Sequence, residues 1–452
     1  MTAMSRSLLP ALAGLVLLAA AIAAAAPDCL APEVSHTDRR DLAALRDAAE
    51  SACPCDAFTS RRDHRRCTRP VVKAALDSAA VRPDCRREAK QLLRQSTCGT
   101  DKVTCGVVRE PEGSYRTCKL RPAGRCTSRG RQTATACPAL PYCADVADWT
   151  AGTCVDVRAN GPFDAGARVI TFTKDSVASP GTPRDLETTI WYPAPPGSGA
   201  VDPTVRAVLD APVAAGGPYP VVMFSHGSCG YSRQSLFLTP FLASHGFVVV
   251  APPHPGNTLF EFPNCGTPQA QVASAQERPQ DVIHVLDEML ALNEDPGSTF
   301  FGTLDPTRIA MMGHSFGGFT TYVVSALDAR IQVAVPLAPA VLGVPPLEIP
   351  SLTVLGAIDS VVNNAATLGV QADSATPKYL AEIRHAGHYA FSDLCFPGPD
   401  CSPPATLAQN EAHVLVRRVV LPYLAVTLAG DDTFRPFLQE PLLPGIALAA
   451  DL

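Results

Sequence analysis

The stretch Arg308-Ile-Ala-Met-Met-Gly-His-Ser-Phe-Gly-Gly-Phe319 decides the fold. It predicts a short buried strand over 308–312, a tight turn, and a helix over about 317–327. The turn has the pattern Gly-x-Ser-x-Gly with Ser315 at its centre. In this pattern the serine occupies a strained strand-to-helix corner with its hydroxyl exposed, and small flanking residues are needed because the two backbones approach closely. Ser315 is therefore the candidate nucleophile.

Strands and helices are expected to alternate on both sides of this corner. Apolar, β-branched runs predict strands over 167–174, 185–192, 220–224, 247–251, 308–312, 331–336, 352–355 and 379–384, and helices are expected over 235–244, 278–292, 317–327 and 406–428. Such alternation indicates an α/β fold with a mostly parallel sheet and helices on both faces. Sites in these sheets lie beyond the carboxyl ends of the strands.

A serine hydroxyl needs a base to remove its proton, and the base should follow Ser315 in a loop. The candidates are His385, His388 and His413. His388 follows Gly387, which marks a loop, whereas His413 lies in a helical run and suits a surface or packing role. We predict that His388 is the base, with His385, which is still close to a strand, as the alternative.

The third member of a triad orients the imidazole and stabilises its charged form. Asp359 directly follows the predicted strand 352–355 and its Gly-Ala-Ile extension. Asp328 ends the helix that follows Ser315, and Asp373 lies in a later loop. Asp359 is therefore the predicted acid.

An oxyanion requires two N–H donors. One should be the residue after the nucleophile, Phe316, and the other should come from the loop that follows strand 220–224. That loop is His226-Gly-Ser-Cys-Gly-Tyr231, and its two glycines allow the backbone to bend towards a substrate. Ser228 is the predicted second donor, and His226 is expected to support the loop by hydrogen bonding.

These motifs resemble the α/β-hydrolase superfamily. The resemblance rests on Trp191-Tyr-Pro193, Phe224-Ser-His-Gly227, Ser244-His-Gly-Phe-Val-Val249 and Gly313-His-Ser-Phe-Gly-Gly318. It is nearest to the group of platelet-activating-factor acetylhydrolases, predicted dienelactone hydrolases and bacterial cutinase-like polyester hydrolases. Asp359 and His388 fit the cutinase-like arrangement. In the acetylhydrolases the acid follows the strand before the one that precedes Asp359. Here that strand runs into residues 336–339, which contain no acid. Well-known dienelactone hydrolases use a cysteine nucleophile, and Ser315 departs from that pattern.

The chain of 452 residues begins like an exported precursor. Arg6 is followed by an apolar run over 8–25 that ends in alanines, so residues 1–25 are predicted to be a cleaved signal peptide. An uncleaved membrane anchor is the alternative, because the run approaches the length of a span. Residues 26–158 are expected to form a cysteine-rich module, and residues 159–452 an α/β catalytic domain.

The predicted module differs from the rest of the chain in cysteine content and charge. It holds 12 of the 16 cysteines, and an even count in an exported chain predicts disulfides. Residues 29–158 contain 23 Lys and Arg against 16 Asp and Glu, whereas residues 159–452 contain 13 against 26. Helices are expected over 41–52, 70–80 and 86–95, followed by a loop-like segment over 105–154. The lack of a Cys-x-x-Cys pair argues against a zinc ribbon.

Four cysteines fall in the second part, namely Cys229, Cys265, Cys395 and Cys401. They allow three pairings. Pairing Cys395 with Cys401 would close a small loop, and pairing Cys229 with Cys265 would then fix the loop of the oxyanion donors.

These observations favour a secreted serine esterase, periplasmic or extracellular, for a short-chain ester, lactone or polyester. The alternative is a binding or adhesion protein with an inert catalytic domain; a peptidase is less favoured because little room is left for a lid. No cofactor, metal or nucleic acid is expected. The arginines of the module fit a solvated surface better than a polyanion site because acids are interspersed, although contact with an anionic surface through 29–158 is retained as a hypothesis. The sequence does not decide the oligomeric state.

Overall fold

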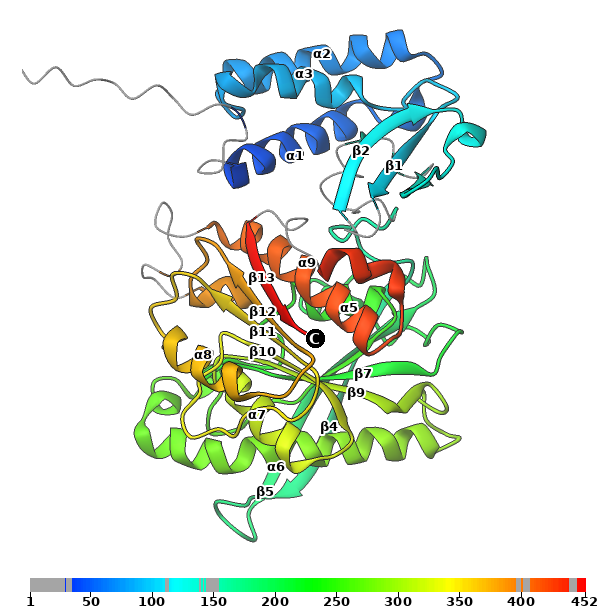
Figure 1. The fold of residues 1–452 in the computed structure, drawn as a ribbon. Helices are drawn as coiled ribbons and strands as arrows, with labels where there is room; N and C mark the ends of the chain where they lie inside the picture. Colours follow the sequence, from blue (N-terminus) through cyan, green and yellow to red (C-terminus); the bar gives the residue numbers. More distant parts are fainter. Residues whose placement is uncertain are drawn as a thin grey trace, which may run out of the picture.

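A computed structural model describes residues 29, 35–109, 114–137, 140, 142–143, 154–395, 400, 407–438 and 445–452. Within them the chain forms a small cysteine-rich module stacked on a larger α/β domain (Figure 1). The predicted signal peptide lies outside the described residues. Among the helices that are described, none combines the length and apolar character required to cross a bilayer.

The α/β domain is built on a ten-stranded sheet. The strands from β8 through β7, β9, β10 and β11 to β12 pair in parallel, while β5 and β13 are antiparallel to their neighbours β8 and β12. In spatial order the strands are β13 (Ile446–Asp451), β12 (Lys378–Ile383), β11 (Ser351–Gly356), β10 (Ile331–Leu337), β9 (Leu304–His314), β7 (Tyr219–Ser225), β8 (Val248–Ala251), β5 (Pro183–Ala194), β4 (Asp164–Asp175) and β6 (Val208–Leu209). The predicted mostly parallel sheet is confirmed.

Helices cover both faces of this sheet (Figure 1). Those bordering the two faces are α5 (Thr239–Ser244) and α9 (Gln409–Thr427) on one side and α6 (Pro268–Glu294) and α7 (Phe316–Leu327) on the other. Alternate residues of β7 point to opposite faces of the sheet: Val222 and Phe224 pack with α5 and α9, whereas Val221 and Met223 pack with α6 and α7. Because every residue of β7 is buried, its sequence is continuously apolar instead of alternating.

Several elements were not predicted. Helix α8 (Asn364–Asp373) and strand β13 are additions, and α6 begins ten residues before the predicted start at 278. Thr267 caps α6 by accepting a hydrogen bond from Ala270 N–H, while Pro279 lies inside the helix. An internal proline is typical of a helix boundary, so it hides the continuity of α6 in the sequence.

The module contains helices α1 (Ser35–Ala52), α2 (Arg61–Asp77) and α3 (Arg86–Arg94). Each predicted helix exists, but α2 begins earlier than expected, at a cap in which Ser60 accepts from Arg62 N–H. The loop-like prediction for 105–154 was wrong in its first half, because β1 (Val103–Arg109), β2 (Ser114–Arg121) and β3 (Gln132–Cys137) form an antiparallel sheet in the order β2-β1-β3. Pairing to β1 and disulfide cross-links hold β2 and β3, whose largely polar sequences give little apolar signal.

All twelve module cysteines are paired, as expected for a disulfide-stapled unit. The bonds are Cys29–Cys85, Cys53–Cys67, Cys55–Cys98, Cys105–Cys126, Cys118–Cys143 and Cys137–Cys154. The apolar core under the helices is small, with buried Leu42, Leu45, Val81 and Ala89. Covalent cross-links stabilise a unit of this size where a large core is lacking.

The segment after the module is anchored on the α/β domain. Val157 is fully buried in the core that α5 and α9 cover. Ser244 accepts a hydrogen bond from Phe163 N–H at its carbonyl and one from Gly161 N–H at its hydroxyl. The anchoring therefore begins before the boundary predicted at residue 158, just after Cys154.

Candidate active site

Ser315 stands between β9 and α7 on a sharp corner. Its backbone has φ 58° and ψ −114°, a conformation that L-residues rarely adopt. The flanking glycines are required by space: a Cβ on Gly317 would lie 1.9 Å from the carbonyl oxygen of Ser225, and one on Gly313 would lie 2.2 Å from that of Gly317. The structure thus forms the predicted strand–turn–helix corner.

Three predicted side chains meet at this corner. His388 Nε2 lies 2.9 Å from Ser315 Oγ, and His388 Nδ1 lies 2.8 Å from Asp359 Oδ2. The side chains of Asp359 and His388 are almost entirely buried. This is the hydrogen-bonded order of nucleophile, base and orienting acid in a Ser–His–Asp triad.

Asp359 and His388 are held by a shared support. The second oxygen of Asp359 accepts from the N–H groups of Val361 and Val362. Asp400 accepts from His388 N–H and from both the N–H and the hydroxyl of Ser360. Although burial opposes its ionisation, these hydrogen bonds hold the pKa of Asp400 below its ordinary value. Asp400 therefore ties the base loop to the acid loop, a role that the sequence did not reveal.

The alternatives considered from the sequence lie elsewhere. His385 is exposed, and the structure brings His388 to Ser315 in its place. His413 stacks on Phe237 and bonds to the carbonyl of Ser392, which fits its expected packing role. Asp328 pairs with Arg330.

Of the two predicted oxyanion donors, Ser228 lines the same cavity as Ser315, and Phe316 directly follows Ser315 in the chain. In the loop after β7, Gly227 N–H donates to Gln234 Oε1 and Gly230 N–H donates to Gly227 O. Within the described residues, the N–H groups of Ser228 and Phe316 donate no hydrogen bond to the protein. Ser228 lines the cavity, and Phe316 opens α7, whose first N–H groups lack helical partners. Neither N–H group is therefore committed to a hydrogen bond among the described residues.

Comparison with known proteins bears on the same segment. A family model described as PET hydrolase-like matches residues 206–394, which include all the predicted site residues. Cutinase est1 of Thermobifida alba is 28% identical over 177 residues, or 38% of this chain and 54% of that protein. Platelet-activating factor acetylhydrolase of Cavia porcellus is 26% identical over 166 residues, or 30% of this chain and 38% of that protein.

A solved structure agrees in fold. Ferulic acid esterase from Streptomyces cinnamoneus matches with a TM-score of 0.51 and 22% identity, covering 65% of this chain and 98% of that one. Together with the fold, these similarities support an α/β-hydrolase domain of the cutinase-like group. This chain spans about half or less of the length of the two curated relatives it matches.

The loop 226–231 of the hydrolase domain, called the oxyanion loop below, is held in place by Arg278 of α6. Arg278 Nη1 donates to His226 O at 2.6 Å, and Nη2 donates to Gly227 O at 3.1 Å and to Asn257 Oδ1 at 2.6 Å. Its guanidinium carbon also lies 4.6 Å from the ring centre of Phe316. Complete burial lowers the pKa of Arg278 to about 9, so the side chain stays charged at neutral pH.

Arg278 thus contacts both the loop that carries Ser228 and the ring of Phe316, the two residues predicted to donate to the oxyanion. The sequence offered no signal for it, because a lone arginine in a helical run is usually solvated. The loop is also fixed by the disulfide Cys229–Cys265, one of the pairings left open above. Cys395 is also disulfide-bonded, and Cys401 lies outside the described residues.

A second Ser–His–Asp chain lies behind this loop. His254 Nε2 is 2.9 Å from Ser225 Oγ, and His254 Nδ1 is 2.9 Å from Asp281 Oδ2. Arg184 donates two hydrogen bonds to Asp281. Burial, together with the charges of Arg278 and Arg184, lowers the pKa of His254 well below its ordinary value, so it stays neutral.

The expectation that His226 supports the loop agrees with this network, since its Nδ1 contacts Gly227 O and its Nε2 accepts from His254 N–H. In the segment 253–257, which follows β8, His254 forms a buried link to the sheet through Ser225.

The cavity at Ser315 is small, about 130 Å³. Its wall includes Gln234, Tyr389 and Leu394. Near it, the exposed ring of Phe260 contacts Tyr231 at the end of the oxyanion loop, and Val361 on the acid loop is also exposed. A small pocket therefore opens between apolar groups on two loops.

Proposed function

We propose that this protein is a serine hydrolase that cleaves carboxylic esters through an acyl-enzyme. The observation that carries the proposal is the placement of His388 between Ser315 Oγ and Asp359, at a strained corner beside two unused N–H groups. Ser315 attacks the ester carbonyl while His388 takes its proton, and Asp359 holds the ring and stabilises its charged form. The N–H groups of Phe316 and Ser228 bind the oxyanion.

The second half of the reaction uses the same groups. His388 gives its proton to the departing alcohol, then takes one from a water molecule that attacks the acyl-enzyme. Collapse of the second oxyanion releases the acid and restores Ser315. Every step uses the three side chains, the two backbone N–H groups and water.

The substrate is proposed to combine a short acyl or aromatic acid with an apolar body that remains outside the pocket. The cavity of about 130 Å³ leaves room for a small group only, while Phe260, 82% exposed, and Val361 offer apolar surface beside it. An apolar chain or polyester surface lying on this rim would bury these side chains. The names of the relatives, cutinase and PET hydrolase-like, agree with such substrates.

Export is proposed from the cysteines. Disulfides that pair every module cysteine form and persist in an oxidising compartment, which is periplasmic or extracellular. There the module, residues 29–158, is proposed to contact an anionic surface. N-terminal sequencing of the mature protein tests export, and a start close to Ala26 is expected.

A series of p-nitrophenyl esters from acetate to palmitate, with a polyester film beside it, tests the activity. We expect turnover that is highest for short acyl chains, release of acid from the film, and covalent labelling of Ser315 by a fluorophosphonate. A folded protein with neither turnover nor labelling would reject the proposal in favour of a binding protein.

A further inference from the structure

Six of the 23 Lys and Arg side chains of residues 29–158 line one groove. Helices α2 and α3 each present cations four residues apart, a spacing that places them on one helix face. These two ladders are Arg65, Arg69 and Lys73 on α2 and Arg86, Lys90 and Arg94 on α3. All of them are exposed, and all line a groove of about 490 Å³ between the helices.

Acidic residues are largely excluded from this groove. Among the described lining residues the one carboxylate is Asp77, which pairs with Lys73 at one end. Asp63 and Glu88 belong to the same helices but do not line the groove. Apart from Asp77, the acids of α2 and α3 therefore lie off the groove that the cations line, which weakens the argument for a merely solvated surface.

The arrangement has an energetic cost. Like charges at positions i and i+4 of a helix destabilise it by about 0.2–0.5 kcal/mol per pair. Partial desolvation, together with the charges of Arg61 and Arg94, lowers the pKa of Arg65. An anion lying in the groove would relieve this repulsion.

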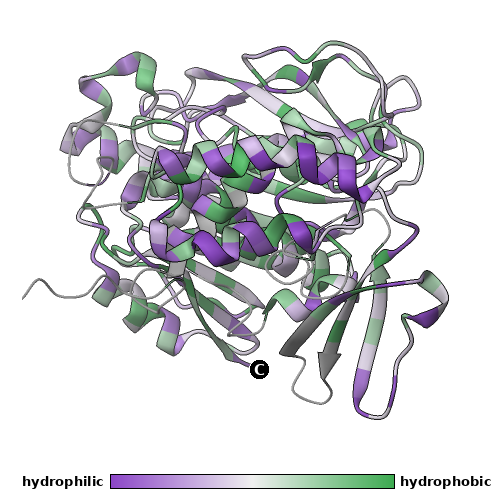
Figure 2. Cartoon of the chain, turned by 90° about the horizontal axis from the view of Figure 1, so that it is seen from above, coloured by the Kyte–Doolittle hydropathy of each residue, from purple (hydrophilic) through white to green (hydrophobic). Residues whose placement is uncertain are grey.

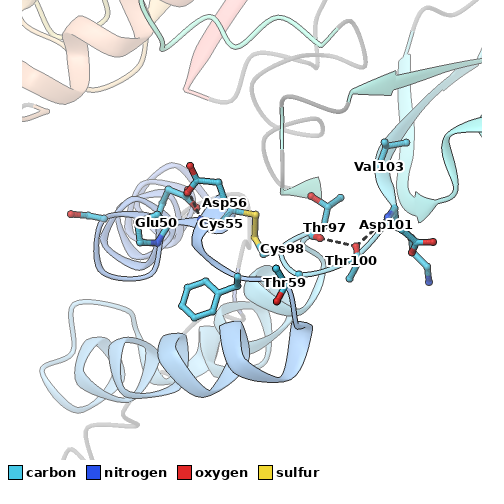
Figure 3. Close-up of a pocket in the computed structure, with 14 residues that line it drawn as sticks. Glu50, Cys55, Asp56, Thr59, Thr97, Cys98, Thr100, Asp101 and Val103 are labelled. Atoms are coloured by element: carbon cyan, nitrogen blue, oxygen red, sulfur yellow. Dashed lines mark hydrogen bonds between the residues drawn. A yellow bond between two sulfur atoms is a disulfide. The ribbon is translucent and has the colours of Figure 1, made fainter.

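The opposite charge collects in a separate hollow of the module, shown in Figure 3. Its lining includes Glu50, Asp56 and Asp101 around the disulfide Cys55–Cys98. Glu50 is already engaged there, because its carboxylate accepts from Cys55 N–H and from the Tyr142 hydroxyl. This hollow carries no proposal, but it shows that the module's charges are segregated.

We propose that the groove between α2 and α3 binds a linear acidic polysaccharide, one that carries carboxylate or sulfate groups on successive sugars. A four-residue helical spacing repeats a cation about every 6 Å, so each ladder extends about 12 Å and suits a polymer with regular charges. This inference rests on the contact with an anionic surface proposed above and names the kind of surface.

Two other polyanions fit the lining less well. The uncharged lining residues are Thr68, Val72, Leu76 and Leu93, so no aromatic ring is present on which nucleic-acid bases could stack. The apolar members are at least partly buried and form the floor, so they cannot insert into a membrane.

The groove lies away from the catalytic site. In Figure 1, α1 separates α2 and α3 from the hydrolase domain, and Figure 2, which looks down on the module, shows hydrophilic residues along its outward helices. Among the described residues, none that lines the cavity at Ser315 comes from the module. A bound polysaccharide would therefore hold the enzyme near a substrate without occupying its active site.

Affinity electrophoresis and calorimetry with polygalacturonate test the proposal on the full chain. The variant Arg69→Glu/Lys90→Glu should weaken binding by about tenfold or more, and added salt should weaken wild-type binding. The control Arg129→Glu/Arg131→Glu makes the same charge change at exposed positions near β3 and should bind like wild type. Both variants should keep wild-type turnover of p-nitrophenyl acetate.

The remaining outcomes are also decisive. No wild-type binding, or equal losses in the two variants, would overturn the proposal. Tighter binding to single-stranded DNA or to phosphatidylglycerol vesicles than to polygalacturonate would overturn the choice of polysaccharide. Binding by a wild-type protein that lacks turnover would count against the esterase function and leave the groove standing.

Discussion

Two Ser–His–Asp chains with nearly equal distances lie on either side of the oxyanion loop. In one, Ser315, His388 and Asp359 are joined at 2.9 and 2.8 Å. In the other, Ser225, His254 and Asp281 are joined at 2.9 and 2.9 Å. Hydrogen-bond geometry therefore does not separate a catalytic arrangement from a structural one.

What separates them is access and surroundings. Ser315 has a positive φ and lines a cavity, whereas Ser225 ends the regular strand β7 and is fully buried. Ser225 is also contacted by Arg278 at 3.3 Å, and the neighbouring cations keep His254 neutral. The inner chain, Ser225–His254–Asp281, is closed to substrate and keeps one protonation state. The outer chain, Ser315–His388–Asp359, adjoins a cavity that has room for a reacting carbonyl.

The largest expected effect is that of removing the outer hydroxyl. Ser315→Ala should lower kcat/KM for p-nitrophenyl acetate by about 10⁴–10⁶-fold and abolish fluorophosphonate labelling, with an unchanged melting temperature. Ser225→Ala is the matched control. It should keep activity within about tenfold, while leaving His254 short of a partner and costing about 1–3 kcal/mol of stability. A larger activity loss in Ser225→Ala would exchange the roles of the two chains.

The acids extend the same contrast. Asp359→Asn should lower kcat by about 10⁴-fold because the imidazole loses its orientation, with little change in stability. Asp281→Asn should instead lower the free energy of unfolding by about 3–5 kcal/mol, since Arg184 and Lys174 face Asp281 in a buried site. Urea unfolding and kinetics at a temperature where both variants are folded separate the two effects. Similar losses of activity in the two variants would contradict the distinction.

The link between the chains is Arg278. Arg278→Met removes the donors that hold His226 O and Gly227 O, so the Ser228 N–H should lose its position. We expect kcat to fall by about 10²-fold with a smaller change in KM, the size of effect seen when one oxyanion donor is lost. Arg278→Lys keeps a charge but not the forked geometry, and should recover only part of this loss. Unchanged kcat in folded Arg278→Met would leave Arg278 a purely structural residue.

The two chains also mark how far sequence reasoning reaches. Ser315, Asp359 and His388 were predictable because each follows a strand, and a parallel sheet gathers such positions at one edge. Arg278 and Asp400 were not, because each acts through backbone groups that only the folded chain brings near. Ser225 was visible as a motif residue, but nothing in the sequence indicates that it bonds to His254, or that His254 bonds to Asp281.

The module illustrates another limit. Its helices were predicted from composition, but its β-sheet was not, because strands held by cross-links need no apolar alternation. The basic ladders were present in the sequence as arginines spaced by four. Their separation from the acids depends on how α2 and α3 pack, and so it required the structure.

A pH series tests how three buried histidines near the two Ser–His–Asp chains affect the free energy of unfolding. His226, His254 and His314 are fully buried, and desolvation places the pKa of each well below the ordinary 6.5. As pH falls below about 6.5, the unfolded chain binds protons that the folded chain does not, so each histidine removes up to about 1.4 kcal/mol of stability per pH unit. Urea unfolding at pH 8, 7, 6 and 5 should show a plateau above pH 7 and a decline below pH 6. Equal stability at pH 7 and pH 5 would mean that these imidazoles are protonated in the folded protein.

The smallest effect is expected from removing the module. Val155 and Val157 pack on the hydrolase core, so a truncated chain should begin at Val155, immediately after the cysteine that bonds to Cys137. A chain beginning at Gly161 is the matched control; it lacks this apolar anchor and should be less stable. Since the described residues that line the cavity at Ser315 all lie in the hydrolase domain, the longer chain should fold and hydrolyse p-nitrophenyl acetate at the full-length kcat/KM. A rise in activity would mean that the module covers the site, and failure to fold would make it part of the catalytic architecture. Unchanged kinetics with lost polygalacturonate binding would assign chemistry to one part of the chain and attachment to the other.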